Sequence, residues 1–223
     1  MSFEPVMPPY NGSDPSASFV SSSALDFLLI ELVPLAYRVT TETPMAADSE
    51  EDEEGTATGK EAATTTADTV AANGSTSAVS LSRIDEDEAM DAVQHKLEST
   101  GYRVGQGLVE RFSKDRPRFS DSLDVIKFLC KDFWSLVFGK NIDNLKTNHR
   151  GVYVLTDNVF RPFSRMSSEP GGQAVTRAQP FLWFPAGIVR GALAALGTEA
   201  TVHAEVHDLP AAVFQIKTMP AKP

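Results

Sequence analysis

One segment, residues 122–139 with the sequence SLDVIKFLCKDFWSLVFG, constrains the fold more than any other part of the chain. At helical spacing its polar residues form a single narrow strip, so nearly all of the remaining surface is apolar. The strip consists of Asp124, Lys127, Lys131 and Ser135. The pattern predicts a central core helix over about 122–138, which Asp121 or Ser122 can cap and Gly139 can end. Its apolar residues should be covered by other elements: Leu123, Ile126, Phe128, Leu129, Phe133, Trp134 and Val137.

Three other segments have apolar residues at helical spacing. The first lies at about 24–39, with a bend expected at Pro34, and the second covers about 86–113. The third covers 180–197, where Gly187 and Gly191 stand four residues apart. Each is long enough to form several helical turns that bury one face.

Alternating residues after the core helix predict strands. Residues 151–165 indicate two strands around an Asp157-Asn158 turn, and residues 198–206 and 211–219 indicate two more. The order of elements is therefore ααα-ββ-α-ββ. This order is typical of an α+β fold with a four-stranded antiparallel sheet.

The charge is distributed unevenly along the chain. Residues 44–88 carry a net charge of −10, whereas residues 1–43 carry −4 and residues 89–223 carry +4. The part from 44 to 84 is acidic and Thr/Ala-rich, has no aromatic residue, and offers little to bury. We therefore expect residues 1–18 to be a disordered tail and residues 44–84 a disordered insertion. Residues 19–43 and 85–219 should form a single domain.

The stretch GYRVGQGLVERF at 101–112 places glycines inside a segment that otherwise favours helix. Their spacing, G-x-x-x-G-x-G after a helical pattern, does not match the phosphate-binding loops, which follow a strand. Gly101 and Gly105 lie four residues apart and share one helix face. We interpret them as positions where another backbone packs closely.

No pattern in the sequence predicts catalysis, a metal site or a cofactor. His203 and His207 would lie about 13 Å apart on a strand, too far to share a metal ion. Cys130 lies on the most apolar helix, where a thiol is usually structural and unreactive. The positive charges do not form a basic stretch with interleaved aromatic residues, so we expect no binding of nucleic acid. We predict that the protein is not an enzyme.

The most apolar stretch, residues 24–39, is too short for a bilayer and contains Asp26, Glu31 and Arg38. The chain has one cysteine, and its first residues lack the pattern of a secretory signal. We expect a cytoplasmic protein whose contact with membranes is peripheral and indirect.

Several long segments of the sequence resemble the subunit-6 type of the TRAPP vesicle-tethering complex. They are GYRVGQ followed by LVERF, the run PRFSDSLDVIKFLCKDFWSLVFGKNIDNLKTNHRGVYVL, and FPAGIVRGALAALG. The resemblance covers about 24–39 and 85–219. It implies the TRAPP small-subunit fold, in which helices pack on one side of a four-stranded antiparallel sheet.

The resemblance also implies partners. A subunit of this type pairs with a Bet-three-type subunit and joins other TRAPP subunits at Golgi and ER-Golgi membranes. It contributes to nucleotide exchange on a Rab-type GTPase only through the whole complex. A partner interface could then be formed by apolar residues of the first two helices: Leu25, Leu28, Leu29, Leu32, Val93, Leu97, Val104 and Leu108.

Two alternatives stay open at this point. The eight apolar residues could belong to the chain's own core instead of an interface. The domain could also bind an apolar small molecule or an acyl chain, as relatives with this kind of fold do. An exposed apolar helix face would favour assembly, and an internal apolar channel would favour a ligand.

Overall fold

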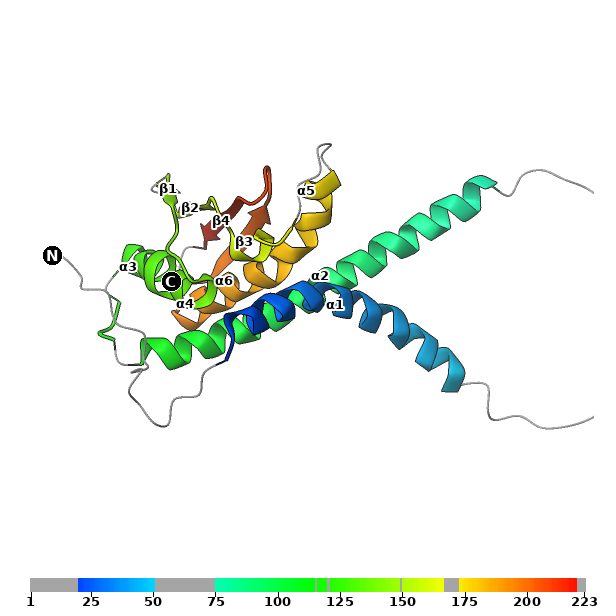
Figure 1. The fold of residues 1–223 in the computed structure, drawn as a ribbon, viewed down its shortest axis with the longest axis horizontal. Coiled ribbons are helices and arrows are strands. Elements are labelled where there is room, and N and C mark those ends of the chain that lie inside the picture. The colour runs from blue at the N-terminus through cyan, green and yellow to red at the C-terminus, as the bar shows by residue number, and fades with distance from the viewer. Residues whose placement is uncertain are drawn as a thin grey trace, which may run out of the picture. The chain divides into compact units, whose positions relative to one another are not determined.

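The computed structural model describes residues 20–50, 75–114, 116–119, 121–148, 150–166 and 173–219 (Figure 1). The chain divides into two compact units. One consists of Met1–Val33 with Gln94–Pro223, and the other is Pro34–Val93. The boundaries of the second unit therefore fall before residue 44 and after residue 84, the limits of the expected insertion.

The first two helices are longer than their apolar patterns predict. Helix α1 spans Ser22–Glu50 and continues through Pro34 without interruption. Helix α2 spans Ser75–Ser113. Residues 44–50 and 75–84, which we expected to be disordered, are thus helical, because extending an existing helix costs less than nucleating a new one. Residues 1–18 and 51–74 lie outside the described residues.

The predicted core helix is confirmed, but it is not a regular α-helix throughout. It consists of α3 (Ser122–Phe128), a π-helical turn η1 (Leu129–Phe133) and α4 (Trp134–Phe138). Asp121 caps it through its backbone carbonyl, with no side-chain bond, and Gly139 ends it with a φ of 81°. Leu123, which was expected to be covered, is exposed because it lies at the open first turn.

Four strands form one antiparallel sheet in the order β1-β2-β4-β3. Their bounds are Asn144–Thr147 for β1, Val152–Asp157 for β2, Ala200–Glu205 for β3 and Ala212–Thr218 for β4. Alternate residues of β2 and β4 are buried, so one face of the sheet packs against helices. This confirms the predicted α+β class.

The hairpin expected around Asp157-Asn158 is wrong. Strand β2 instead pairs with β1, which precedes it, and with β4. The residues after Asp157 form a 3-10 turn, η2 (Arg161–Phe163), in which Pro162 has no N–H to donate to a strand ladder. The rest of the chain adds α5 (Gln173–Ala178), a 3-10 turn η3 (Gln179–Leu182) and α6 (Trp183–Ala195), which packs against β3.

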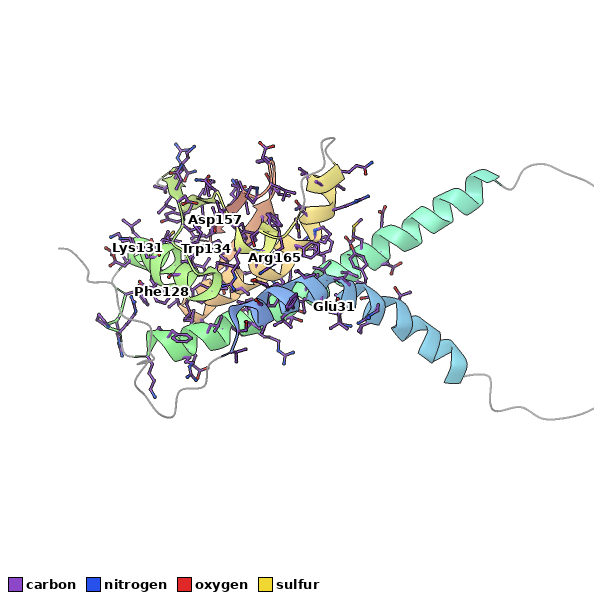
Figure 2. The ribbon with its side chains drawn as sticks, in the orientation of Figure 1. Glu31, Phe128, Lys131, Trp134, Asp157 and Arg165 are labelled. Carbon is purple, nitrogen blue, oxygen red and sulfur yellow. The ribbon has the colours of Figure 1, made fainter. Side chains whose placement is uncertain are left out.

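Aromatic side chains fill the core between the sheet and the core helix. Trp134, Phe160 and Phe214 are fully buried, and the ring of Trp134 meets that of Phe214 edge-on at 5.1 Å between centroids. The Trp134 indole N–H donates to Asp157 Oδ2 over 2.9 Å, and Figure 2 shows these two residues side by side. The tryptophan therefore ties the core helix to the end of β2.

Candidate partner interface

Helix α1 carries an exposed apolar face within its first three turns. Phe27 and Leu28 are 65% and 59% exposed, and Leu25 and Ile30 are exposed to a smaller degree. The more buried positions, Asp26, Leu29 and Val33, follow one another at helical spacing on another side. An apolar face of this kind is typical of a surface that another protein covers.

The eight residues expected at an interface do not share one environment. Leu25, Leu28 and Val104 are exposed, and Leu29, Leu32 and Leu108 are half-buried. Val93 and Leu97 are only 1% and 2% exposed. A side chain that its own chain has already buried leaves no area for a partner, so these two residues do not form part of an open surface.

Two pairs of glycines bring α2 and α6 into backbone contact. A Cβ atom built on Gly105 would lie 3.0 Å from the amide nitrogen of Ala192, and one on Gly101 would lie 3.0 Å from that of Ile188. In return, a Cβ atom on Gly191 would lie 2.8 Å from the Cα atom of Tyr102. Glycine is needed at such positions because a side chain would force the helices apart.

Side chains at the edge of this crossing also join the two helices. The Arg190 guanidinium lies 5.4 Å from the centre of the Tyr102 ring and 3.6 Å from Glu98 Oε2. Glu98 also accepts a hydrogen bond from the Gln94 amide over 2.8 Å. The glycine crossing thus continues into polar contacts at the surface.

An ion pair connects α1 to the turn that follows the sheet strand β2. Asp26 Oδ1 accepts a hydrogen bond from Arg161 Nε over 2.9 Å, and Oδ2 accepts from both Nε and Nη2 of Arg165 over 3.2 Å. The hydrogen bond from Arg161 lowers the pKa of the Asp26 carboxyl below its ordinary value, against the opposing effect of desolvation, and Arg165 adds to the lowering.

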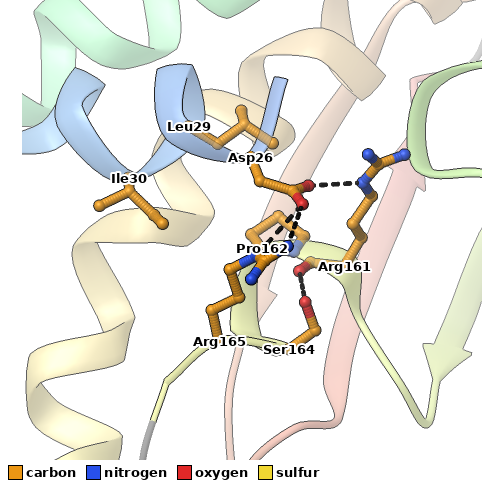
Figure 3. A pocket seen from close by; sticks show the side chains of 7 residues that line it. All are labelled: Asp26, Leu29, Ile30, Arg161, Pro162, Ser164 and Arg165. Atoms are coloured by element: carbon orange, nitrogen blue, oxygen red, sulfur yellow. Dashed lines mark hydrogen bonds and ion pairs between the residues drawn. The ribbon is translucent and has the colours of Figure 1, made fainter. Parts of the chain in front are cut away.

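These residues surround a small hollow (Figure 3). Leu29 and Ile30 of α1 lie on one side, with Pro162, Ser164 and the two arginines on the other. Its volume of about 10 Å³ has room for about one water molecule, far less than an acyl chain needs. Cys130 does not line it.

Cys130 lies in the π-helical turn and is buried. Burial raises the pKa of its thiol to about 12, because the thiolate would lose its hydration. Within the parts of the chain that the structure describes, no group of three or more His, Cys, Asp or Glu side chains is placed to hold a metal ion. Nor is any helix in those parts long and apolar enough to cross a bilayer.

The sequence analysis did not identify Phe27 as part of the exposed face, or Asp26 as the partner of two arginines. The signal for Asp26 was present, because a carboxylate inside the apolar run ALDFLLIEL needs a partner or water. Its partners could not be identified, because Arg161 lies 135 residues away in the chain.

The described residues combine an α+β fold with an exposed apolar helix face. In a comparison with known families, residues 25–219 match the model of the transport protein particle (TRAPP) component. The chain therefore belongs to the TRAPP component family, as the resemblance of its sequence segments indicated.

Curated relatives agree with this assignment. The chain is 57% identical over 121 residues to trafficking protein particle complex subunit 6b of Danio rerio, which covers 54% of this chain and 76% of that protein. Subunit 6B of Homo sapiens is 54% identical over 54% of this chain and 75% of its own length. An uncharacterised protein of Schizosaccharomyces pombe is 33% identical over 90% of this chain and 65% of its own length.

A crystal structure of a trafficking protein particle complex subunit 3 from Naegleria fowleri, covalently bound to palmitic acid, matches this chain with a TM-score of 0.49 and 15% identity. The match covers 65% of this chain and 90% of that one. A likeness this distant has no bearing on function.

Proposed function

We propose that this protein is a non-enzymatic assembly subunit of the TRAPP complex and pairs with a Bet-three-type subunit through the exposed face of α1. The observation that carries the proposal is the exposure of Phe27 and Leu28 on a chain whose relatives are named as subunits of a complex. Aromatic and large aliphatic residues in such positions are the usual anchors of protein interfaces.

The biological role follows from this pairing. Within the complex, the subunit supports vesicle tethering and nucleotide exchange on a Rab-type GTPase, which it reaches only through the whole assembly. Its place would be at Golgi and ER-Golgi membranes, with indirect membrane contact. Leu25 and Val104 are the other exposed members of the predicted interface and extend the proposed contact.

Co-expression with the Bet-three-type subunit tests the proposal. Leu28→Glu and Phe27→Glu place a charge on the face but retain a good helix former, so the chain should stay folded. Loss of an interface anchor of this kind weakens binding by roughly thirtyfold or more. We therefore expect both variants to be folded but no longer to co-purify with the partner.

Leu123→Glu is the matched control, because Leu123 is also an exposed leucine in a helix, at the start of α3. It should co-purify as the wild type does. If Leu28→Glu and Phe27→Glu bind the partner as tightly as the control, the face is not the interface. If they are insoluble while the control is soluble, these residues belong to the chain's own core.

A further inference from the structure

The first three turns of α1 bury little apolar area against the rest of the chain. None of the side chains at residues 23–32 is buried, and Val33 is the first buried residue after them. Leu29 is half-buried and Ile30 is exposed, although both line the hollow beside Pro162 (Figure 3). Burial of so little apolar area contributes little to fixing a helix in one orientation.

Asp26 supplies a polar attachment at the same place. Its side chain is only 15% exposed, and both of its carboxylate oxygens accept hydrogen bonds from guanidinium groups. The two arginines belong to different positions of one turn, Arg161 within η2 and Arg165 just after it. Two guanidinium groups that each bind one oxygen fix the rotation of the carboxylate as well as its distance.

The direction of the exposed face depends on this attachment. Successive residues of a helix are turned by about 100°, so Phe27 and Leu28 point about 100° and 200° away from Asp26. When Asp26 faces Arg161 and Arg165, Leu28 therefore faces almost directly outward, as its exposure shows. A rotation of the helix would carry Phe27 and Leu28 out of register with a partner.

We infer that Asp26, held by Arg161 and Arg165, is a positioning residue that anchors the start of α1 and sets the direction in which Phe27 and Leu28 meet the partner. This inference rests on the proposed function of the α1 face. It assigns to the ion pair a role in preorganising an interface, where rigidity in the bound conformation raises affinity.

Asp26→Asn tests the anchor because it retains the size of the side chain and removes its charge. Hydrogen exchange of the isolated full-length chain should become about fivefold faster at residues 22–33, the size of effect that loss of a partly exposed ion pair produces. The affinity for the Bet-three-type subunit should fall by a similar factor. Exchange in the sheet and in α6 should not change.

Asp124→Asn is the control. It also removes one negative charge, from an exposed ion pair with Lys127 within α3. It should alter neither the exchange at residues 22–33 nor partner binding. Salt gives a second control: raising NaCl from about 0.05 M to about 1 M should speed this exchange in the wild type but not in Asp26→Asn, since only the wild type retains the ion pair.

Arg165→Gln gives a graded form of the same test. Arg165 is 55% exposed and bonds to one carboxylate oxygen, while Arg161 keeps the other. The variant should fold normally and show a smaller increase in exchange than Asp26→Asn. It keeps the inference testable if Asp26→Asn fails to fold.

If hydrogen exchange at residues 22–33 is unchanged in Asp26→Asn and in Arg165→Gln, Asp26 does not anchor the helix. Faster exchange with undiminished partner binding would show that the anchor does not prepare the interface. Failure of the proposed function has a different signature, because Leu28→Glu would then bind the partner normally whatever the exchange of the Asp26 variants.

Discussion

Asp157 is fully buried, yet each of its carboxylate oxygens accepts hydrogen bonds. Oδ2 accepts from the Trp134 indole, and Oδ1 accepts from Lys140 Nζ over 2.8 Å and from the Val159 amide over 3.1 Å. Lys140 also bonds to Asp143 Oδ2 over 2.6 Å. Lys140 thus pairs with two carboxylates at the end of β2, and its charge together with these hydrogen bonds allows Asp157 to be buried.

Loss of Lys140 should therefore be costly. Lys140→Met would leave the buried Asp157 without its cation, and we expect the free energy of unfolding at pH 7 to fall by about 1–3 kcal/mol. Urea denaturation of the variant and of Lys127→Met measures the difference. Lys127 forms only an exposed pair within one helix turn, so its variant should change stability by less than about 0.5 kcal/mol.

The same cluster predicts a pH dependence. The hydrogen bonds from Lys140 and from the Asn158 amide lower the pKa of Asp143, so its stabilising contribution is present above the ordinary carboxyl range and is lost as the pH falls through the lowered value. Desolvation lowers the pKa of Lys140, but bonds to Asp143 and Asp157 outweigh it and raise the pKa overall. The lysine contribution is then lost only at high pH.

We accordingly expect the stability gap between wild type and Lys140→Met to be full at neutral pH. It should narrow as the pH falls below the ordinary carboxyl range of about 4 and through the lowered pKa of Asp143. Urea denaturation across this range would measure it. A gap that stays constant down to about pH 2 would contradict the assigned role of the Lys140 and Asp143 pair.

Cys130 should behave as an unreactive core residue. With a thiol pKa of about 12, about one molecule in ten thousand carries the thiolate at pH 8, and burial blocks access as well. Labelling of the native protein by a maleimide should be slow and should accelerate on unfolding. Rapid labelling, or an acyl chain on Cys130 in the intact-mass spectrum, would instead revive the hypothesis of a lipid-binding domain.

Cys130→Ser should lower the free energy of unfolding by about 1–3 kcal/mol, because a hydroxyl in an apolar site needs a hydrogen bond that the thiol does not. Partner binding and membrane association in cells should be retained, since Cys130 lies inside the core helix. Thermal denaturation and co-purification measure the two effects separately.

At the scale of elements, the crossing of α2 and α6 distinguishes two glycines of one helix. A Cβ atom at Gly105 would collide with the backbone of α6, whereas one at Gly107 would meet nothing within 4 Å. Gly105→Ala should therefore destabilise the protein despite the better helix propensity of alanine. Gly107→Ala should stabilise it by up to about 1 kcal/mol.

Gly105→Leu should lower the free energy of unfolding by more than Gly105→Ala does, at or above the upper end of about 1–3 kcal/mol. It should also weaken pairing with the partner if the displaced α2 moves its exposed residues. Urea denaturation of the three variants under one set of conditions provides the comparison. If the two alanine variants shift stability equally and in the same direction, the backbone contact with α6 does not exist in solution.

The connection between strands shows how an element can be misassigned from its sequence. Residues 159–165 were predicted to form a strand after Asp157-Asn158, but β2 pairs with β1 and β4. Strand pairing is a non-local choice, and the buried side chains of Phe160 and Phe163 are satisfied by packing in a 3-10 turn. Phe160 and Phe163 are buried, but burial does not alternate along residues 159–165 and the segment forms a turn instead of a strand.

At the scale of the whole molecule, the acidic region should contribute little to folding of the unit formed by Met1–Val33 and Gln94–Pro223. Residues 44–84 contain no aromatic side chain, and loop closure depends only weakly on length. Replacing these residues by a flexible Gly/Ser linker should change the Tm by less than about 3 °C and leave partner binding intact. A larger loss would show that residues 44–84 pack against the rest of the chain.

The sequence by itself determined the elements whose buried residues recur with a local period. The core helix at 122–138, the strands β3 and β4 and the α+β class were all predictable, because an apolar pattern with a period of 3.6 or 2 residues has few other solutions. The glycine pair at 101 and 105 likewise gave a local signal of close packing.

Only the tertiary structure decided which apolar residues the chain uses for itself. Val93 and Leu97 look like Leu28 in the sequence, but the first two are buried and the third is exposed. The partners of Asp26 were also decided by the tertiary structure, because Arg161 and Arg165 lie more than a hundred residues away in the chain. A local pattern indicates that a side chain is apolar or charged and needs a partner. Which partner it contacts depends on long-range packing, because the partner lies in a distant segment of the chain.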